Sequence, residues 1–256
     1  MQGADYLTGT VQASGQSWSA DVLGYRAVFN GRSSLCPQTG RYTLAIGGSN
    51  SLALPGGSGY ATCQVSPAGR LTLAGSLADG TRFTRAAWVS EQAVCPLYVQ
   101  LYSGKGSLVS WLAFTNNQTL GGELAWSRPT TKAKRYGAGF AWITQAVGAR
   151  YLPPANGTNA FGTTGSSLNL SLTGGDLKQT LAAQFTLNGK NQVKDLPTAL
   201  KLRLSFNAGS GRFQGRTVDP DTHKGVAFSG VVLQNQTNGW GYFLGSTNSG
   251  QVLLSP

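Results

Sequence analysis

The chain has 256 residues, of which only 11% are charged and 36 are glycine, and its formal net charge is +11. Its length suffices for one large domain or two modest ones, and its many aliphatic and aromatic residues exclude a disordered chain. Because no run of 18 apolar residues is present, no transmembrane helix is predicted. The positive charge favours an anionic partner, although net charge also maintains solubility.

Alternation of apolar and polar residues predicts β-strands along most of the chain. The clearest runs, in chain order, are 42–46, 97–101, 168–172 and 200–206. A stretch at 177–184 can be interpreted equally as a helix or a strand. Tight-turn dipeptides separate the runs, at positions 30–31, 56–57, 79–80, 188–189 and 238–239. Short strands at this spacing predict an all-β fold, either an antiparallel barrel or a sandwich.

Two parts of the chain repeat the same order of features, which predicts an internal duplication. Residues 69–111 and 211–253 both run from a strand through an acidic turn to a strand, then to aromatic and glycine-bounded strands. We therefore expect two related halves, at residues 1–126 and 166–256. Residues 127–165, rich in Pro and Gly, are expected to form a basic connection between them.

The expected connection, with Trp126 just before it, also supplies the predicted ligand-binding residues. Basic and aromatic side chains cluster there, and aromatic faces beside cations stack on sugar rings or bases. The alternative is that these aromatic residues are packed in a core. The predicted contact residues are Trp126, Arg128, Lys132, Lys134, Arg135, Tyr136 and Trp142.

The cysteine and histidine content argues against a zinc site. The chain has three cysteines, Cys36, Cys63 and Cys95, so they cannot all be paired in disulfides. Two alternatives remain open: one disulfide with one free thiol, or three free thiols. His223 is the single histidine, and no Cys-x-x-Cys pair exists. We expect no metal ion and no cofactor. Because Met1 to Leu7 do not resemble a signal peptide, we expect Met1 to follow a removed leader or an upstream domain.

No catalytic arrangement can be recognised in the sequence. A Ser-His-Asp or Cys-His set would need His223, which lies in a polar segment with Asp219 and Asp221 that is typical of a turn. A glycosidase needs only two carboxylates, and Glu91 and Glu123 could converge in space. No phosphate-binding or dinucleotide-binding motif is present. Enzymatic activity therefore stays open, with a non-enzymatic role favoured.

Three segments resemble an uncharacterised all-β domain of large secreted bacterial multidomain proteins. They are Gly75 to Thr81, Pro96 to Ser107 and the Gly-Tyr-Phe-Leu-Gly segment at 241–245. The resemblance covers most of the chain, although the cysteines depart from the pattern. It implies a secreted or cell-surface location in a bacterium and no assigned activity, because its motifs are turn and strand motifs.

These features favour a secreted, non-catalytic binding or adhesion module for a polysaccharide or another anionic surface polymer. One alternative is a structural spacer or a self-assembling unit of a surface protein, which pairs through strand edges. Another is a carbohydrate-active enzyme that uses carboxylates. Nucleic-acid binding fits the charge but has no supporting motif, so it ranks last.

Overall fold

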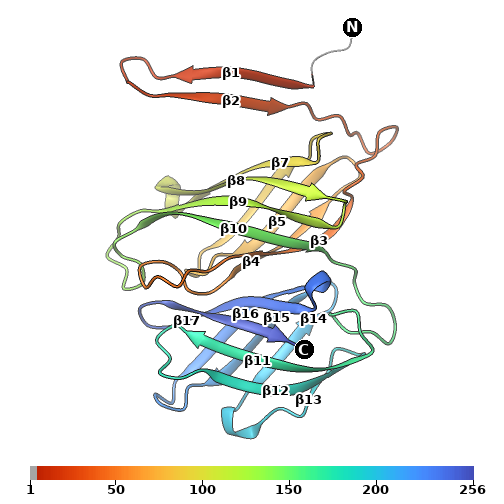
Figure 1. Cartoon of the computed structure of the whole chain (residues 1–256), viewed down its shortest axis with the longest axis vertical. Coiled ribbons are helices and arrows are strands. Elements are labelled where there is room, and N and C mark those ends of the chain that lie inside the picture. Colours follow the sequence, from red (N-terminus) through yellow and green to blue (C-terminus); the bar gives the residue numbers. More distant parts are fainter. Residues whose placement is uncertain (1–4) are drawn as a thin grey trace.

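The computed structural model describes residues 5–256 and is all-β (Figure 1). An isolated N-terminal hairpin, β1 (Tyr6–Gln12) and β2 (Ser19–Tyr25), lies at one end. Two antiparallel eight-stranded sheets follow, and each curls into a nearly closed barrel. The barrels lie one after the other along the long axis of the molecule.

Each barrel is a meander whose last strand returns to pair with its first. The first barrel contains β3 (Gly40–Ile46), β4 (Gly59–Val65), β5 (Arg70–Ser76), β6 (Arg82–Trp88), β7 (Val94–Leu101), β8 (Gly106–Thr115), β9 (Thr119–Arg128) and β10 (Phe140–Arg150). The second contains β11 (Gly165–Gly174), β12 (Leu181–Asn188), β13 (Val193–Lys194), β14 (Arg203–Asn207), β15 (Arg212–Val218), β16 (Gly225–Leu233), β17 (Asn238–Leu244) and β18 (Ser249–Ser255). Strand β10 pairs with β3, and β18 pairs with β11.

The shared strand order confirms the prediction of an all-β barrel fold with two related halves. The ladder is open between β6 and β7 in the first barrel and between β13 and β14 in the second. The similar segments 69–111 and 211–253 form β5–β8 and β15–β18, which are the third to sixth strands of one barrel and the fifth to eighth of the other. The two segments that are similar in sequence therefore do not occupy equivalent strands. The second segment begins two strands later in its barrel than the first segment does in its own.

The expected boundary of the first half at 126 is wrong. Strand β10 lies inside the expected connection 127–165, and it closes the first barrel by pairing with both β9 and β3. Its inward positions include the small or polar residues Thr144 and Ala146, so it shows no clear apolar alternation. The link between the barrels is therefore only 151–164.

The predicted alternation of burial holds in some strands and not in others. All residues of the predicted run 42–46 in β3 are buried, because its outer face packs against the second barrel. Strand β7 buries every second residue, including Leu97, Val99 and Leu101. Of the ambiguous stretch 177–184, residues 177–180 lie outside any helix or strand, and residues 181–184 begin β12. Of the predicted strand 200–206, Leu200 is the last residue of the single-turn helix η2 (Thr198–Leu200), and β14 starts at Arg203. Further single turns are η1 (Tyr102–Gly104) and η3 (Gln234–Gln236).

Each barrel has its own apolar core, and a separate contact joins the two. Tyr60 and Ala78 of the first barrel pack with Val231 and Tyr242 of the second. The Thr43 hydroxyl donates to a carbonyl of the second barrel at 2.6 Å. Buried apolar surface with satisfied polar groups resembles a domain interior, so the barrels pack as one unit.

Candidate functional site

The structure brings the seven predicted contact residues near one another, but it buries three of them. Trp126 and Tyr136 are only 1% and 7% exposed. The Arg128 guanidinium forms an ion pair with the buried carboxylate of Asp79. These three side chains therefore stabilise the fold and cannot contact a ligand, so the predicted site is wrong at these positions.

A polar network inside the first barrel accounts for the burial of Trp126 and Arg128. The Trp126 indole donates to the Tyr102 hydroxyl at 3.0 Å, and that hydroxyl donates to Asp79 at 2.7 Å. The Arg128 guanidinium also lies over the Tyr102 ring, 5.2 Å from its centroid. Burial raises the pKa of Tyr102, and the negative charge of Asp79 raises it further. The phenol therefore stays protonated and keeps its donor role.

The loop between β9 and β10 connects this network to the second barrel. The Tyr136 hydroxyl contacts the side chains of Asn248 and Ser249 in the turn that leads into β18. The Arg135 guanidinium donates to the Gly245 carbonyl at 2.8 Å. These contacts make the loop a bridge between the barrels. Of the other predicted residues, Lys132 and Lys134 are exposed, and Trp142 is half-buried against the core.

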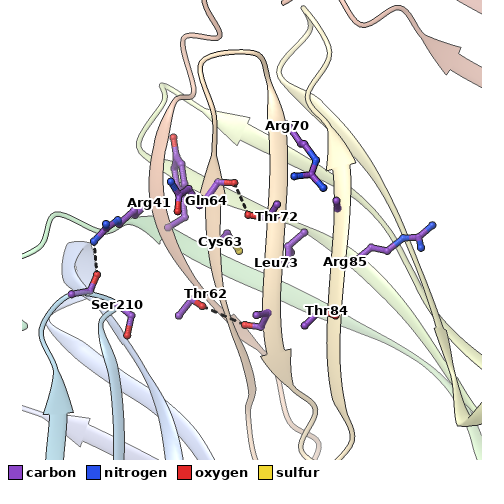
Figure 2. Close-up of a pocket in the computed structure, with 14 residues that line it drawn as sticks. Arg41, Thr62, Cys63, Gln64, Arg70, Thr72, Leu73, Thr84, Arg85 and Ser210 are labelled. Atoms are coloured by element: carbon purple, nitrogen blue, oxygen red, sulfur yellow. Dashed lines mark hydrogen bonds between the residues drawn. The ribbon is translucent and has the colours of Figure 1, made fainter. Parts of the chain in front are cut away.

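A different set of basic side chains lines a groove along one side of both barrels. In the first barrel, the outward residues of β3 to β6 form its floor because strand alternation directs every second residue outward. Arg41 pairs across the ladder with Gln64, and Gln64 pairs with Thr72. Figure 2 shows Arg41 on one side and Arg70 and Arg85 on the other.

The groove continues across the junction onto the second barrel. Its first hollow shares Ala74 and Thr84 with a second hollow, which is bounded by Arg82 and by Arg212 of the second barrel. A further hollow over β14–β16 is lined by two more arginines. The three have volumes of about 660, 440 and 640 Å³. We call this set the arginine groove, and its cations are Arg41, Arg70, Arg82, Arg85, Arg203, Arg212 and Arg216.

The arginine groove has no compensating negative charge. None of its described lining residues is Asp or Glu. Within residues 5–256 the two ion pairs are Arg26–Asp5 and Arg128–Asp79, neither of which involves the groove. Two of its guanidinium groups donate to neutral acceptors: Arg41 donates to the Gly209 carbonyl, and Arg212 donates to the Tyr60 hydroxyl. Concentrated, unpaired cations in a concave surface create a strong positive potential.

An exposed aromatic ring adjoins the groove. Trp88 is 51% exposed at the end of β6, and its cross-strand partner is Arg70. Trp88 lies on the same face of β6 as the groove residues Thr84 and Ala86, because residues two apart share a face. The groove therefore combines guanidinium groups with a flat apolar platform. No local sequence pattern predicts the groove, because its arginines are scattered between positions 41 and 216.

The other candidate groups occupy structural positions. Asp219 accepts hydrogen bonds from the amide of Asp221 and the hydroxyl of Thr222, which lower its pKa and organise the turn around His223. Glu91 lies in the turn between β6 and β7, and Glu123 lies on the outer face of β9. In residues 5–256 no group of three His, Cys, Asp or Glu could hold a metal ion. No helix there is long and apolar enough to cross a membrane.

The three cysteines are buried free thiols, which selects one of the two alternatives left open by the sequence. Burial raises the pKa of Cys95 to about 12, and burial followed by the proximity of Cys95 raises that of Cys63. A raised thiol pKa favours the unreactive neutral form, so at pH 8 the thiolate fraction of Cys95 is on the order of 10⁻⁴.

We expect a disulfide reagent to label no cysteine of the native protein within minutes at pH 8, and all three in denaturant. Fast native labelling, followed by absorbance, would contradict this prediction.

Comparison of the chain with protein-family models finds no match, and comparison with curated proteins finds none either. The resemblance to a domain of secreted bacterial proteins therefore stays a prediction.

Proposed function

We propose that the protein is a non-catalytic binding module for an acidic polysaccharide, which it holds along the arginine groove. The observation that carries the proposal is the run of seven arginines, unpaired with carboxylates, along one side of both barrels. An open groove that crosses two domains suits an extended polymer rather than a small enclosed ligand.

The choice of arginine supports a ligand with planar or branched anionic groups. All eight lysines of the chain lie outside the groove lining. A guanidinium group offers a rigid fork of donors that binds carboxylate, sulfate or phosphate oxygens in pairs, which an ammonium group cannot do. The groove is therefore suited to a chain that bears carboxylate or sulfate groups at intervals.

The exposed Trp88 ring favours a sugar backbone over a simple polyanion. Pyranose rings present apolar C–H faces, and an exposed indole beside a cation provides a surface on which such a face can stack. The groove floor supplies neutral hydrogen-bonding groups from Thr62, Gln64 and Thr72. Inorganic polyphosphate would use the arginines alone.

The test is titration of the full chain with an acidic polysaccharide, a neutral glucan and inorganic polyphosphate, at low and high salt. We expect the triple variant Arg70→Gln, Arg82→Gln, Arg212→Gln to weaken binding of the acidic polysaccharide by about a hundredfold or more at low salt, since charge-assisted hydrogen bonds contribute about 1.5–3 kcal/mol each. We expect Trp88→Ala to weaken it by roughly tenfold at either salt concentration, in line with the worth of aromatic stacking.

The matched control removes the same charge elsewhere, with Lys105→Gln, Lys132→Gln and Lys134→Gln, all at exposed positions. We expect this control to change the affinity by less than roughly threefold, because exposed distant charges are screened. An equal loss in both triple variants would show that net charge, not the groove, binds the polymer. Binding that Trp88→Ala leaves unchanged, with equal affinity for polyphosphate, would refute a sugar ligand.

A further inference from the structure

The outer face of β7–β10 exposes several large apolar side chains. Five of them, on β7, β8 and β10, are between 41% and 65% exposed, namely Tyr98, Val109, Trp111, Ile143 and Val147. Contiguous apolar patches on a soluble protein surface mark interaction sites. We call this surface the apolar face.

Cross-strand pairing makes the apolar face continuous. Tyr98 pairs with Val109, Val109 pairs with Ala125, and Ala125 pairs with Ile143, so one row crosses all four strands. Side chains in such a row are direct neighbours on the sheet surface. Three exposed alanines, Ala113, Ala125 and Ala141, also lie on this face, so its surface is uneven in height.

The apolar face also carries no positive charge. No exposed residue of β7–β10 is Lys or Arg, and Glu123 is the single charged one. The whole chain nevertheless carries a net charge of +11. Two copies of this chain repel one another through most of their surfaces, but they can approach through this face without bringing cations together.

We infer that the apolar face binds the same face of a second copy of this chain, across a two-fold axis. Such an isologous contact pairs each patch with itself, and here it places bulky side chains of one copy against alanine positions of the other. Two sheet faces that pack in this way form a sandwich with about 10 Å between them. The hairpin does not cover the face: its Tyr25 ring meets Trp111 at one edge, and Trp111 stays 42% exposed.

The contact leaves the arginine groove free. In the closed strand order of the first barrel, β7–β10 lie across from β3–β6, whose outward residues form the groove floor. A dimer therefore presents two grooves on its outer sides. Two grooves on one polymer raise the apparent affinity by avidity without any new contact.

Analytical ultracentrifugation of the full chain tests the proposal. We expect a dimer at micromolar concentration, and we expect the double variant Val109→Lys, Ile143→Lys to raise the dimer dissociation constant by at least roughly a hundredfold, because it buries like charges against one another. The variant Val109→Glu, Ile143→Glu should likewise be monomeric. A mixture of the two should form a heterodimer, because opposite charges then face each other across the axis.

The control is Leu7→Lys with Val11→Lys in the hairpin, two residues that are 67% and 50% exposed. This variant should remain dimeric, and thermal unfolding should show that all variants are folded. A wild-type chain that is monomeric at its highest soluble concentration would overturn the inference. So would dissociation by the hairpin variant alone, or a Lys and Glu mixture that fails to associate.

Discussion

Asp79→Asn is expected to lower the free energy of unfolding by about 3–5 kcal/mol, because it leaves the Arg128 guanidinium buried without its counter-charge. The Asp79 side chain has no exposed surface, and that of Arg128 is only 10% exposed. The carboxylate also accepts hydrogen bonds from the Thr81 amide at 2.9 Å and from the Tyr102 hydroxyl at 2.7 Å. One substitution thus disturbs a turn, an ion pair and the network that holds Trp126. Guanidinium-induced unfolding, followed by tryptophan fluorescence, measures the change.

The exposed ion pair between Arg26 and Asp5 provides the control. Its side chains are 58% and 43% exposed, so Asp5→Asn should cost at most about 1 kcal/mol. Restoring charge balance in the interior, with Asp79→Asn and Arg128→Met together, should recover part of the lost stability, because no unpaired charge then remains buried. Similar losses from Asp79→Asn and Asp5→Asn would show that burial of the pair has no energetic consequence.

Gly57→Ala is expected to lower the free energy of unfolding by about 1–3 kcal/mol, because the added methyl group forces the two barrels apart. A Cβ atom on Gly57 would lie 2.3 Å from the Gly250 carbonyl oxygen and 2.4 Å from the Tyr242 Cβ, both in the second barrel. The first contact is with backbone, which cannot rotate away. The added methyl group must therefore displace the whole interface that contains Tyr60 and Tyr242. Differential scanning calorimetry should show a lower Tm.

Gly9→Ala is the matched control, because a Cβ atom there has no neighbour within 4 Å. Both glycines lie outside the positive-φ region, so the comparison isolates crowding from backbone strain. We expect Gly9→Ala to leave the Tm unchanged within error. A Gly57→Ala protein that unfolds like the wild type would mean that the barrels are not packed as closely as the structure shows.

The architecture followed from local information wherever one face of a strand is buried and the other is exposed. Strands such as β7 and β11 alternate strictly, because the barrel interior accepts apolar side chains and the outer face contacts water. Prediction failed at β10, whose inward Thr144 and Ala146 fit close to neighbouring strands and need no large apolar side chain. It also failed to separate core aromatics from surface aromatics in the cluster around Trp126, since burial depends on partners such as Asp79 and Tyr102.

The all-β class, the two related halves and the surplus of positive charge could all be predicted from the amino-acid sequence. These properties depend on periodicity and composition, which are local or summed over the chain. The position of Arg41, Arg70 and Arg212 along one groove, and the burial of Arg128 with Asp79, follow from tertiary packing. Packing of one barrel against the other places Arg212 near first-barrel residues that are more than a hundred positions away in the chain. The periodicity within one strand does not indicate which other surface its outward face will adjoin.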